Sequence, residues 1–193
     1  MPEAGRLLAA LLALTTLLFP VIVYFGLERL SPRVLGLILV AAFLARLVFL
    51  LKGKALQAGR SLGIGAALAG IGLAGGAWVC EQADLFLFYP VLVNGMLLLM
   101  FAASLVKPPS VIERLARLRE PDLPEAAVAY TRGVTKLWCG FFMINGGIAL
   151  ATAIKADMEI WTLYNGLISY VLMGALFGAE FLVRRKAQRR AAA

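Results

Sequence analysis

The sequence predicts an all-α, polytopic membrane protein with six transmembrane helices, because three of its properties agree. The chain has 193 residues, of which 62% are hydrophobic, and its mean hydropathy is +0.87. Soluble domains are closer to half apolar. Apolar stretches recur along the chain, each long enough to cross about 30 Å of hydrocarbon. They lie at about 7–27, 34–51, 61–80, 85–106, 137–154 and 160–183, and together they form one transmembrane domain covering 1–193.

The positive charges are divided unequally between the two sides of this arrangement. Of the 19 Lys and Arg residues, only Arg29, Arg33 and Lys155 lie in the loops of one side, and Arg46 lies within a span. The others lie in the termini and in the opposite loops. Because Lys and Arg concentrate on the cytoplasmic side, we expect a bacterial inner-membrane protein with both termini in the cytoplasm. Topology then explains the net charge of +8, and no nucleic-acid partner is predicted.

The longest loop, 108–136, is predicted to form a cytoplasmic amphipathic helical hairpin between the fourth and fifth spans. Pro108 and Pro109 end the fourth span, and Ser110 and Glu113 have the spacing of a capping box. A short helix on the inner leaflet should follow, since apolar residues recur at helical spacing; they are Val111, Ile112, Leu115 and Leu118. A second helix, from about Glu125, is expected to run into the fifth span.

All three asparagines lie within predicted spans, and each precedes a glycine. An amide in hydrocarbon is costly unless it is hydrogen-bonded, and an adjacent glycine allows another helix to come close. We therefore expect Asn94, Asn145 and Asn165 to form a polar seam between the last three spans. The alternative is that these amides line a path for a polar substrate.

Two ionisable residues also lie within spans. Arg46 and Glu180 are expected to pair, because an unpaired charge inside the membrane is costly; the alternative is that both extend to the headgroups. Four basic residues flank the hairpin and could bind a lipid phosphate, with loose contact with anionic lipids as the alternative. These residues are Arg114, Arg117, Arg132 and Lys136.

Aromatic and small residues are predicted to help place the helices. Trp78, Trp138 and Trp161 fall at span ends, as in the aromatic belts of membrane proteins. The third span is rich in glycine and alanine. Gly72 and Gly76 have the small-xxx-small spacing that permits close helix approach.

Several residues that enzymes use are missing from the sequence. There is no histidine, no aspartate within a span, no Gly-x-Ser-x-Gly elbow and no phosphate-binding loop. No catalytic residue, metal or cofactor is therefore predicted. This favours a protein that is not an enzyme.

The second half of the chain, about 85–185, resembles a known family in the order and spacing of several motifs. They are Lys107-Pro108, Ile112-x-Arg114, Leu123-Pro124, Trp138-x-x-Phe141-Phe142, Gly146 and Ile160-Trp161. The pattern is similar to the intracellular septation protein A family, which are small polytopic inner-membrane proteins of Gram-negative bacteria. That resemblance implies a role in division or envelope synthesis.

A closer resemblance is to a group of uncharacterised bacterial polytopic membrane proteins that accompany aryl-polyene and fatty-acid-like biosynthesis genes. It rests on Phe88 to Asn94, Pro109 to Ala116, Trp138 to Gly146 and Leu163 to Ile168. The resemblance implies an envelope-lipid context and transfers no catalytic residue.

Three hypotheses for function follow. The first is a non-enzymatic inner-membrane accessory protein for the synthesis, handling or export of an aryl-polyene type envelope lipid. Its hairpin would contact anionic lipids or a membrane or cytoplasmic enzyme. The second is a septation or envelope-synthesis scaffold. The third is a small transporter or intramembrane enzyme built around Asn94, Asn145, Arg46 and Glu180.

Overall fold

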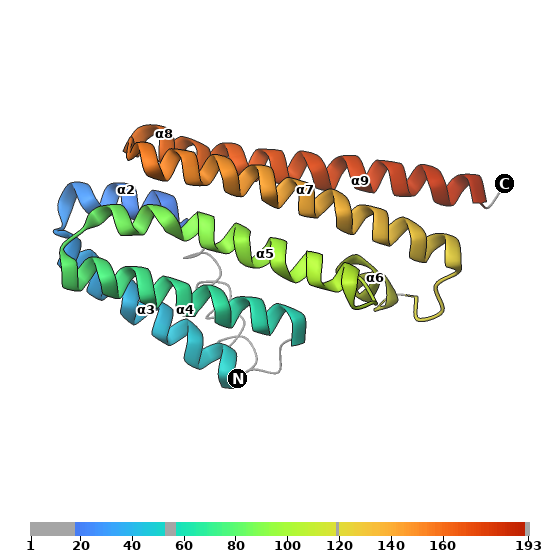
Figure 1. The fold of residues 1–193 in the computed structure, drawn as a ribbon, viewed down its shortest axis with the longest axis horizontal. Helices are drawn as coiled ribbons and strands as arrows, with labels where there is room; N and C mark the ends of the chain where they lie inside the picture. Colours follow the sequence, from blue (N-terminus) through green and yellow to red (C-terminus); the bar gives the residue numbers. More distant parts are fainter. Residues whose placement is uncertain (1–17, 53–56, 119, 192–193) are drawn as a thin grey trace, which may run out of the picture.

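The computed structural model describes residues 18–52, 57–118 and 120–191, and over these residues the fold is an all-α bundle. The long helices run roughly along one common axis (Figure 1). Five of them are long and apolar enough to cross a membrane. Their bounds are Pro32–Lys52, Gly63–Cys80, Ala83–Val106, Glu125–Lys155 and Met158–Arg185. The all-α membrane class is thus confirmed, and the sixth span stays a prediction because residues 7–17 lie outside the described chain.

Two of the first three described helices pack closely along each other. Helix α2, Phe19–Arg29, has a proline in its first turn, where a missing N–H breaks no helical hydrogen bond. Helix α3, Pro32–Lys52, packs along α4, Gln57–Cys80. A Cβ atom at Gly36 would lie 2.7 Å from the Ala74 carbonyl oxygen. Only glycine therefore permits this approach of the α3 and α4 backbones.

The predicted fourth span consists of two segments. A 3-10 turn, η1, covers Ala83–Phe88, and α5, Tyr89–Val106, follows it with Pro90 in its first turn. Pro90 therefore starts a helix and does not kink the middle of one. The buried side chains of η1 join the rings of Phe19 and Phe43 in one of two hydrophobic cores.

The predicted hairpin region contains two helices at the expected positions. Helix α6, Val111–Arg117, begins with the capping box of Ser110 and Glu113. Helix α7 runs without a break over Glu125–Lys155. The expectation that the second helix continues into the fifth span is therefore confirmed. The second hydrophobic core lies where α5, α6 and α7 meet, around Phe101, Val111 and Trp138.

The final span is built from three consecutive segments. Helix α8, Met158–Leu163, is capped by the Asp157 side chain, which accepts a hydrogen bond from the Ile160 N–H at 3.0 Å. A π-helical turn, η2, covers Tyr164–Ile168, and α9 covers Ser169–Ala191. Helix α9 is far less buried than the other long helices, with 6% of its most apolar window inside the bundle.

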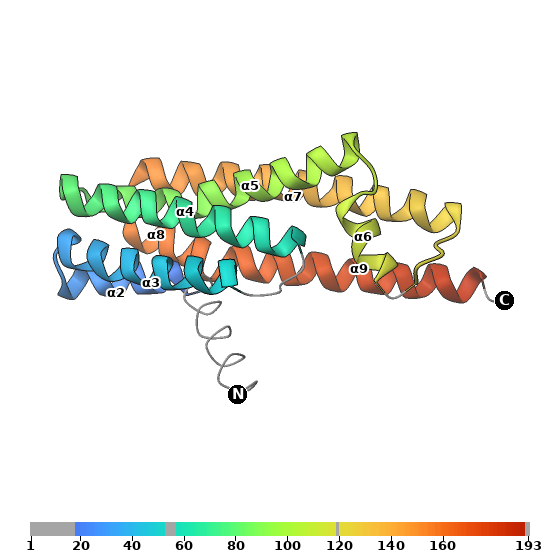
Figure 2. The same cartoon turned by 90° about the horizontal axis from the view of Figure 1, so that it is seen from below.

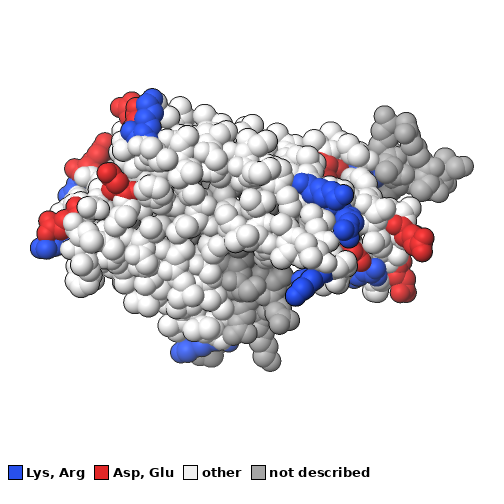
Figure 3. All heavy atoms as spheres, in the orientation of Figure 1, with Lys and Arg blue, Asp and Glu red and all other residues white. Residues whose placement is uncertain are grey.

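Most charged side chains gather at the two ends of the bundle, and the face shown in Figure 3 has few charged side chains between them. Helices α7 and α9 extend beyond α4 and α5 at the end where α6 lies (Figures 1 and 2). An apolar middle with charged ends fits a bundle that crosses a membrane.

Candidate functional site: an asparagine network beside an apolar groove

A chain of hydrogen bonds joins α5, α7 and η2 in the middle of the bundle. Asn94 donates to the Pro90 carbonyl oxygen at 2.8 Å, within α5. Asn145 of α7 donates to Asn94 Oδ1 at 3.0 Å, and the Tyr164 hydroxyl donates to Asn145 Oδ1 at 2.9 Å. All three side chains of Asn94, Asn145 and Tyr164 are buried. The structure therefore brings the last spans together through amides, as the sequence indicates.

Asn165 belongs to a second, neighbouring set of hydrogen bonds. Its amide nitrogen donates to Thr152 Oγ1 at 3.2 Å and to the Trp161 carbonyl oxygen at 2.9 Å. An asparagine amide has two N–H donors, so both donors of Asn165 are used within the bundle. Asn165 thus ties η2 to α7 and to its own preceding turn.

Asn94 and Asn145 differ from Asn165 in what they leave unused. Each of them donates one hydrogen bond among the described residues, so each amide keeps a second N–H. Asn145 Oδ1 accepts from Tyr164 and has a second lone pair. These two amides therefore retain capacity to bind another polar group.

An apolar groove of about 370 Å³ lies between α7 and α9 and reaches this network. It runs from Tyr164 to Ala179 along the chain, which is about 22 Å at a rise of 1.5 Å per residue. Asn145 and Tyr164 are its polar lining residues. The remaining lining residues are Phe141, Ile144, Ile148, Leu172, Ala175, Leu176 and Ala179.

A smaller cavity of about 80 Å³ is also lined by Asn145. All three asparagines line it, together with Ser169 and Tyr170. Asn145 alone among the asparagines faces both spaces. It therefore lies between the groove and the smaller cavity, which also has several apolar lining residues.

Only one of the three glycines that follow an asparagine makes a close contact. A Cβ atom at Gly146 would lie 3.1 Å from Asn94 Cβ, so this glycine lets α7 approach α5. Nothing lies within 4 Å of such an atom at Gly95, and Gly166 has ordinary contacts. Among the described residues, Asn94 and Asn145 bond to each other, to the Pro90 carbonyl oxygen of the same helix and to the Tyr164 hydroxyl, and not to the backbone of a neighbouring helix.

The structure does not bring Arg46 and Glu180 together. Glu180 accepts a hydrogen bond from the Tyr130 hydroxyl at 3.4 Å and forms an ion pair with Arg184, N to O 3.7 Å. Arg46 is on α3, which lies across the bundle from α9 (Figure 1). Tyr130 precedes the predicted fifth span by several residues. Glu180 therefore lies beyond the depth expected for it, where α7 and α9 extend past the other helices.

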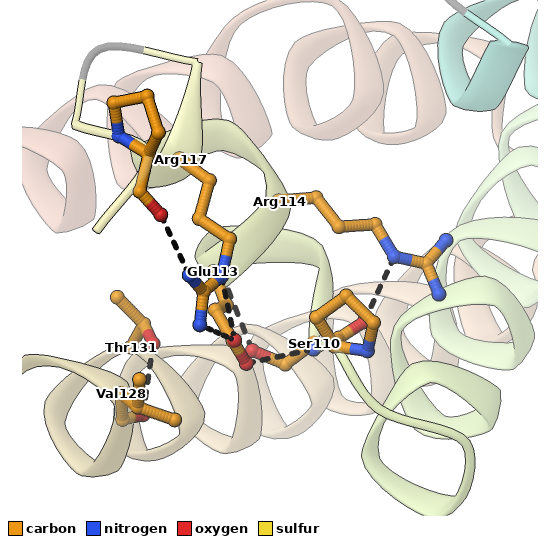
Figure 4. A network of polar contacts seen from close by, with 8 residues as sticks. Ser110, Glu113, Arg114, Arg117, Val128 and Thr131 are labelled. Atoms are coloured by element: carbon orange, nitrogen blue, oxygen red, sulfur yellow. Dashed lines mark hydrogen bonds and ion pairs between the residues drawn. The ribbon is translucent and has the colours of Figure 1, made fainter. Parts of the chain in front are cut away.

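The basic residues of the hairpin are largely engaged in holding its own fold (Figure 4). Arg117 donates to Glu113 Oε1 at 3.0 and 2.9 Å and to the Pro121 carbonyl oxygen at 2.8 Å. Arg114 donates through Nε to the Pro109 carbonyl oxygen at 2.8 Å. The rest of the Arg114 guanidinium points away from Glu113 in Figure 4.

Arg132 and Lys136 complete the predicted basic set on α7. Arg132 donates to the Leu105 carbonyl oxygen at 3.0 Å, which ties α7 to the last turn of α5. Lys136 is exposed one turn further along α7. The four residues thus border one corner of the bundle, where Arg117 is half-exposed and its partner Glu113 is buried. Among the described residues no cluster of His, Cys, Asp or Glu is suited to a metal ion.

Helix α6 divides its apolar residues between the bundle and the surroundings. Val111 is buried and Ile112 packs with it in the core, and the Val111 N–H donates to Ser104 Oγ of α5 at 3.1 Å. Leu115 and Leu118 are exposed. Half of the apolar pattern that predicts membrane contact is therefore used for packing.

Comparisons of the chain with protein-family models, curated proteins and solved structures found no match. Sequence reasoning did not identify Tyr164 and Thr152 as partners of the asparagines, or the groove. The repeat Gly174-Ala175 and Gly178-Ala179 is the signal for the groove, since small residues on α9 leave the space open.

Proposed function

We propose that this chain is a non-enzymatic accessory protein of the bacterial inner membrane that binds a hydrocarbon chain of an envelope lipid between α7 and α9. The groove is the observation that carries the proposal. It is apolar over most of its length, and α9 is little buried. A cleft of this size and lining suits an apolar ligand with a few polar contacts.

The lining of the groove also supports binding in preference to catalysis. Of the described residues that line it, only Tyr164 is titratable, and its hydroxyl hydrogen is directed to Asn145. General acid–base catalysis needs a group that exchanges a proton near the operating pH. An aryl-polyene type lipid, which the sequence resemblance implies, fits such a binding site as its long apolar chain would fill the groove.

The basic corner of α5, α6 and α7 supplies a second element of the proposal. Both termini and this corner would face the cytoplasm, where Arg114 and Lys136 meet anionic headgroups. Leu115 and Leu118, exposed on α6, would contact the inner leaflet or a partner enzyme. The envelope lipid would thus enter the groove from the cytoplasmic side.

Photo-crosslinking in proteoliposomes tests the groove directly. The probe is a stearate with a diazirine in the middle of its chain, and labelled peptides are mapped by mass spectrometry. We expect labels on the groove-lining parts of α7 and α9, and a strong decrease in the variant Ala175→Phe, which fills the groove. Val171→Phe is the matched control, because Val171 is exposed on the same helix and does not line the groove.

Labels spread evenly over all lipid-facing helices, or unchanged by Ala175→Phe, would contradict the proposal. The cellular counterpart is mass spectrometry of lipid extracts from a deletion strain complemented with wild type, Ala175→Phe or Val171→Phe. Loss or build-up of one lipid in the deletion and Ala175→Phe strains alone is the expected result.

A further inference from the structure

The groove has polar side chains only where Asn145 and Tyr164 line it. Asn145 is 4% exposed and Tyr164 9% exposed, yet both line the groove. Asn145 retains an N–H and a lone pair beyond its bonds to Asn94 and Tyr164. The Tyr164 oxygen has donated its hydrogen and retains acceptor capacity. The pair therefore offers both a donor and an acceptor to one ligand.

The depth of this pair determines where on a ligand its polar group would lie. Asn145 is eight residues inside the predicted start of its span at residue 137, which is about 12 Å at 1.5 Å per residue. A lipid with its headgroup at the cytoplasmic surface would bring the middle of its chain to Asn145. A terminal headgroup would not reach that position without leaving the interface.

We propose that the groove selects a hydrocarbon chain that carries a hydroxyl or carbonyl oxygen near its middle over the same chain without it. This inference rests on the proposed lipid-binding function and specifies the ligand's chemistry. An unsubstituted chain covers Asn145 and Tyr164 and leaves the second N–H of Asn145 and the Tyr164 oxygen without a partner, which is costly. A chain oxygen at that depth satisfies them, and polar sites of this kind discriminate against analogues that lack the group.

Competition against the photoreactive stearate tests this selection in wild-type protein. The competitors are stearate and a hydroxystearate with its hydroxyl group at mid-chain, each quantified in the vesicle bilayer. We expect the hydroxystearate to reduce groove labelling at a concentration about two- to tenfold lower, as one net hydrogen bond implies. Equal competition, or better competition by stearate, overturns the inference and leaves the lipid-binding function intact. If neither fatty acid competes, the proposed function fails and the inference with it.

Two asparagine variants separate the ligand contact from the packing of the bundle. Asn145→Leu removes the amide that faces the groove, and we expect the two competitors to become equal. Asn165→Leu is the matched control, because both N–H donors of Asn165 are used by Thr152 and Trp161 and Asn165 does not line the groove. It should keep the hydroxystearate preference. Loss of the preference in both variants, or in neither, overturns the assignment to Asn145. The wild-type comparison tests the selection independently of both variants.

Discussion

The α3–α4 pair and the α7–α9 pair are held together in different ways. Along α3 and α4 the backbones touch, with Gly36 against Ala74 and Gly70 under the ring of Phe43. Helix α7 is instead joined to η2 and α9 at separate points along its length. Asn145 accepts a hydrogen bond from Tyr164 of η2, and Trp138 packs on Phe177 of α9 with ring centroids 4.4 Å apart. Further along, the Tyr130 hydroxyl donates to Glu180 of α9.

The difference shows how one membrane bundle can contain a closely packed helix pair and a helix pair with a groove between its members. Lipid tails are as apolar as leucine, so apolar contact alone does not drive helices together. Small residues on both sides allow α3 and α4 to close along their length. Between the contacts of Tyr164 and Glu180, the small residues Ala175 and Ala179 of α9 line the groove, and the space remains open. The site thus exists because α7 and α9 are fastened at separate points.

The largest expected effect on stability comes from a substitution that forces α3 and α4 apart. Gly36→Val should lower the free energy of unfolding by about 1–3 kcal/mol, since its Cβ would meet the Ala74 carbonyl oxygen at 2.7 Å. Gly72→Val is the control, because nothing lies within 4 Å of a Cβ atom there. Unfolding in mixed detergent micelles measures both variants. Equal losses would show that close approach does not hold this pair.

A smaller effect is expected from the polar attachment. In a double-mutant cycle of Asn94→Leu and Asn145→Leu, we expect a coupling energy of about 0.6–2 kcal/mol, the range for hydrogen bonds between membrane helices. Asn94→Leu combined with Thr131→Val is the control cycle. Thr131 bonds to its own helix at Val128, so the two changes should add. Additive behaviour of Asn94 and Asn145 would contradict their role as an attachment.

The smallest effect concerns the glycines beside the asparagines. Gly95→Ala should stabilise the protein by up to about 1 kcal/mol through helix propensity, as its Cβ meets nothing within 4 Å. Gly146→Ala should gain less or lose stability, because its Cβ would lie 3.1 Å from Asn94 Cβ. Thermal unfolding of the two single variants gives the comparison. A larger gain at Gly146 would mean that α7 and α5 are not in close contact there.

Local features of the chain were predictable to within a few residues. The capping box of Ser110 and Glu113, and the start of α7 at Glu125, depend on neighbours in sequence. The charge pair was not predictable. It depends on how far each helix extends, because α9 extends past α3 and Glu180 meets Tyr130 instead of Arg46.

The tryptophans also show that some features are predictable from the sequence and others depend on the tertiary structure. Trp78 is exposed at a helix end, as an aromatic belt requires. Trp161 is fully buried, and its indole N–H donates to the Leu87 carbonyl oxygen at 3.0 Å. Trp138 is buried in the core with Phe142. A position at a span end therefore does not reveal which side of the helix faces lipid.

The sequence by itself determined that the chain is helical and built for a membrane, since apolar length and charge bias act on each segment separately. It also indicated that the last spans meet through asparagines, because an amide in hydrocarbon requires a partner. Only the tertiary structure decided which amides use all their hydrogen-bond donors, which glycines lie close to a neighbouring helix, and where a groove remains. These properties depend on the rotation and spacing of whole helices, which many distant side chains set together.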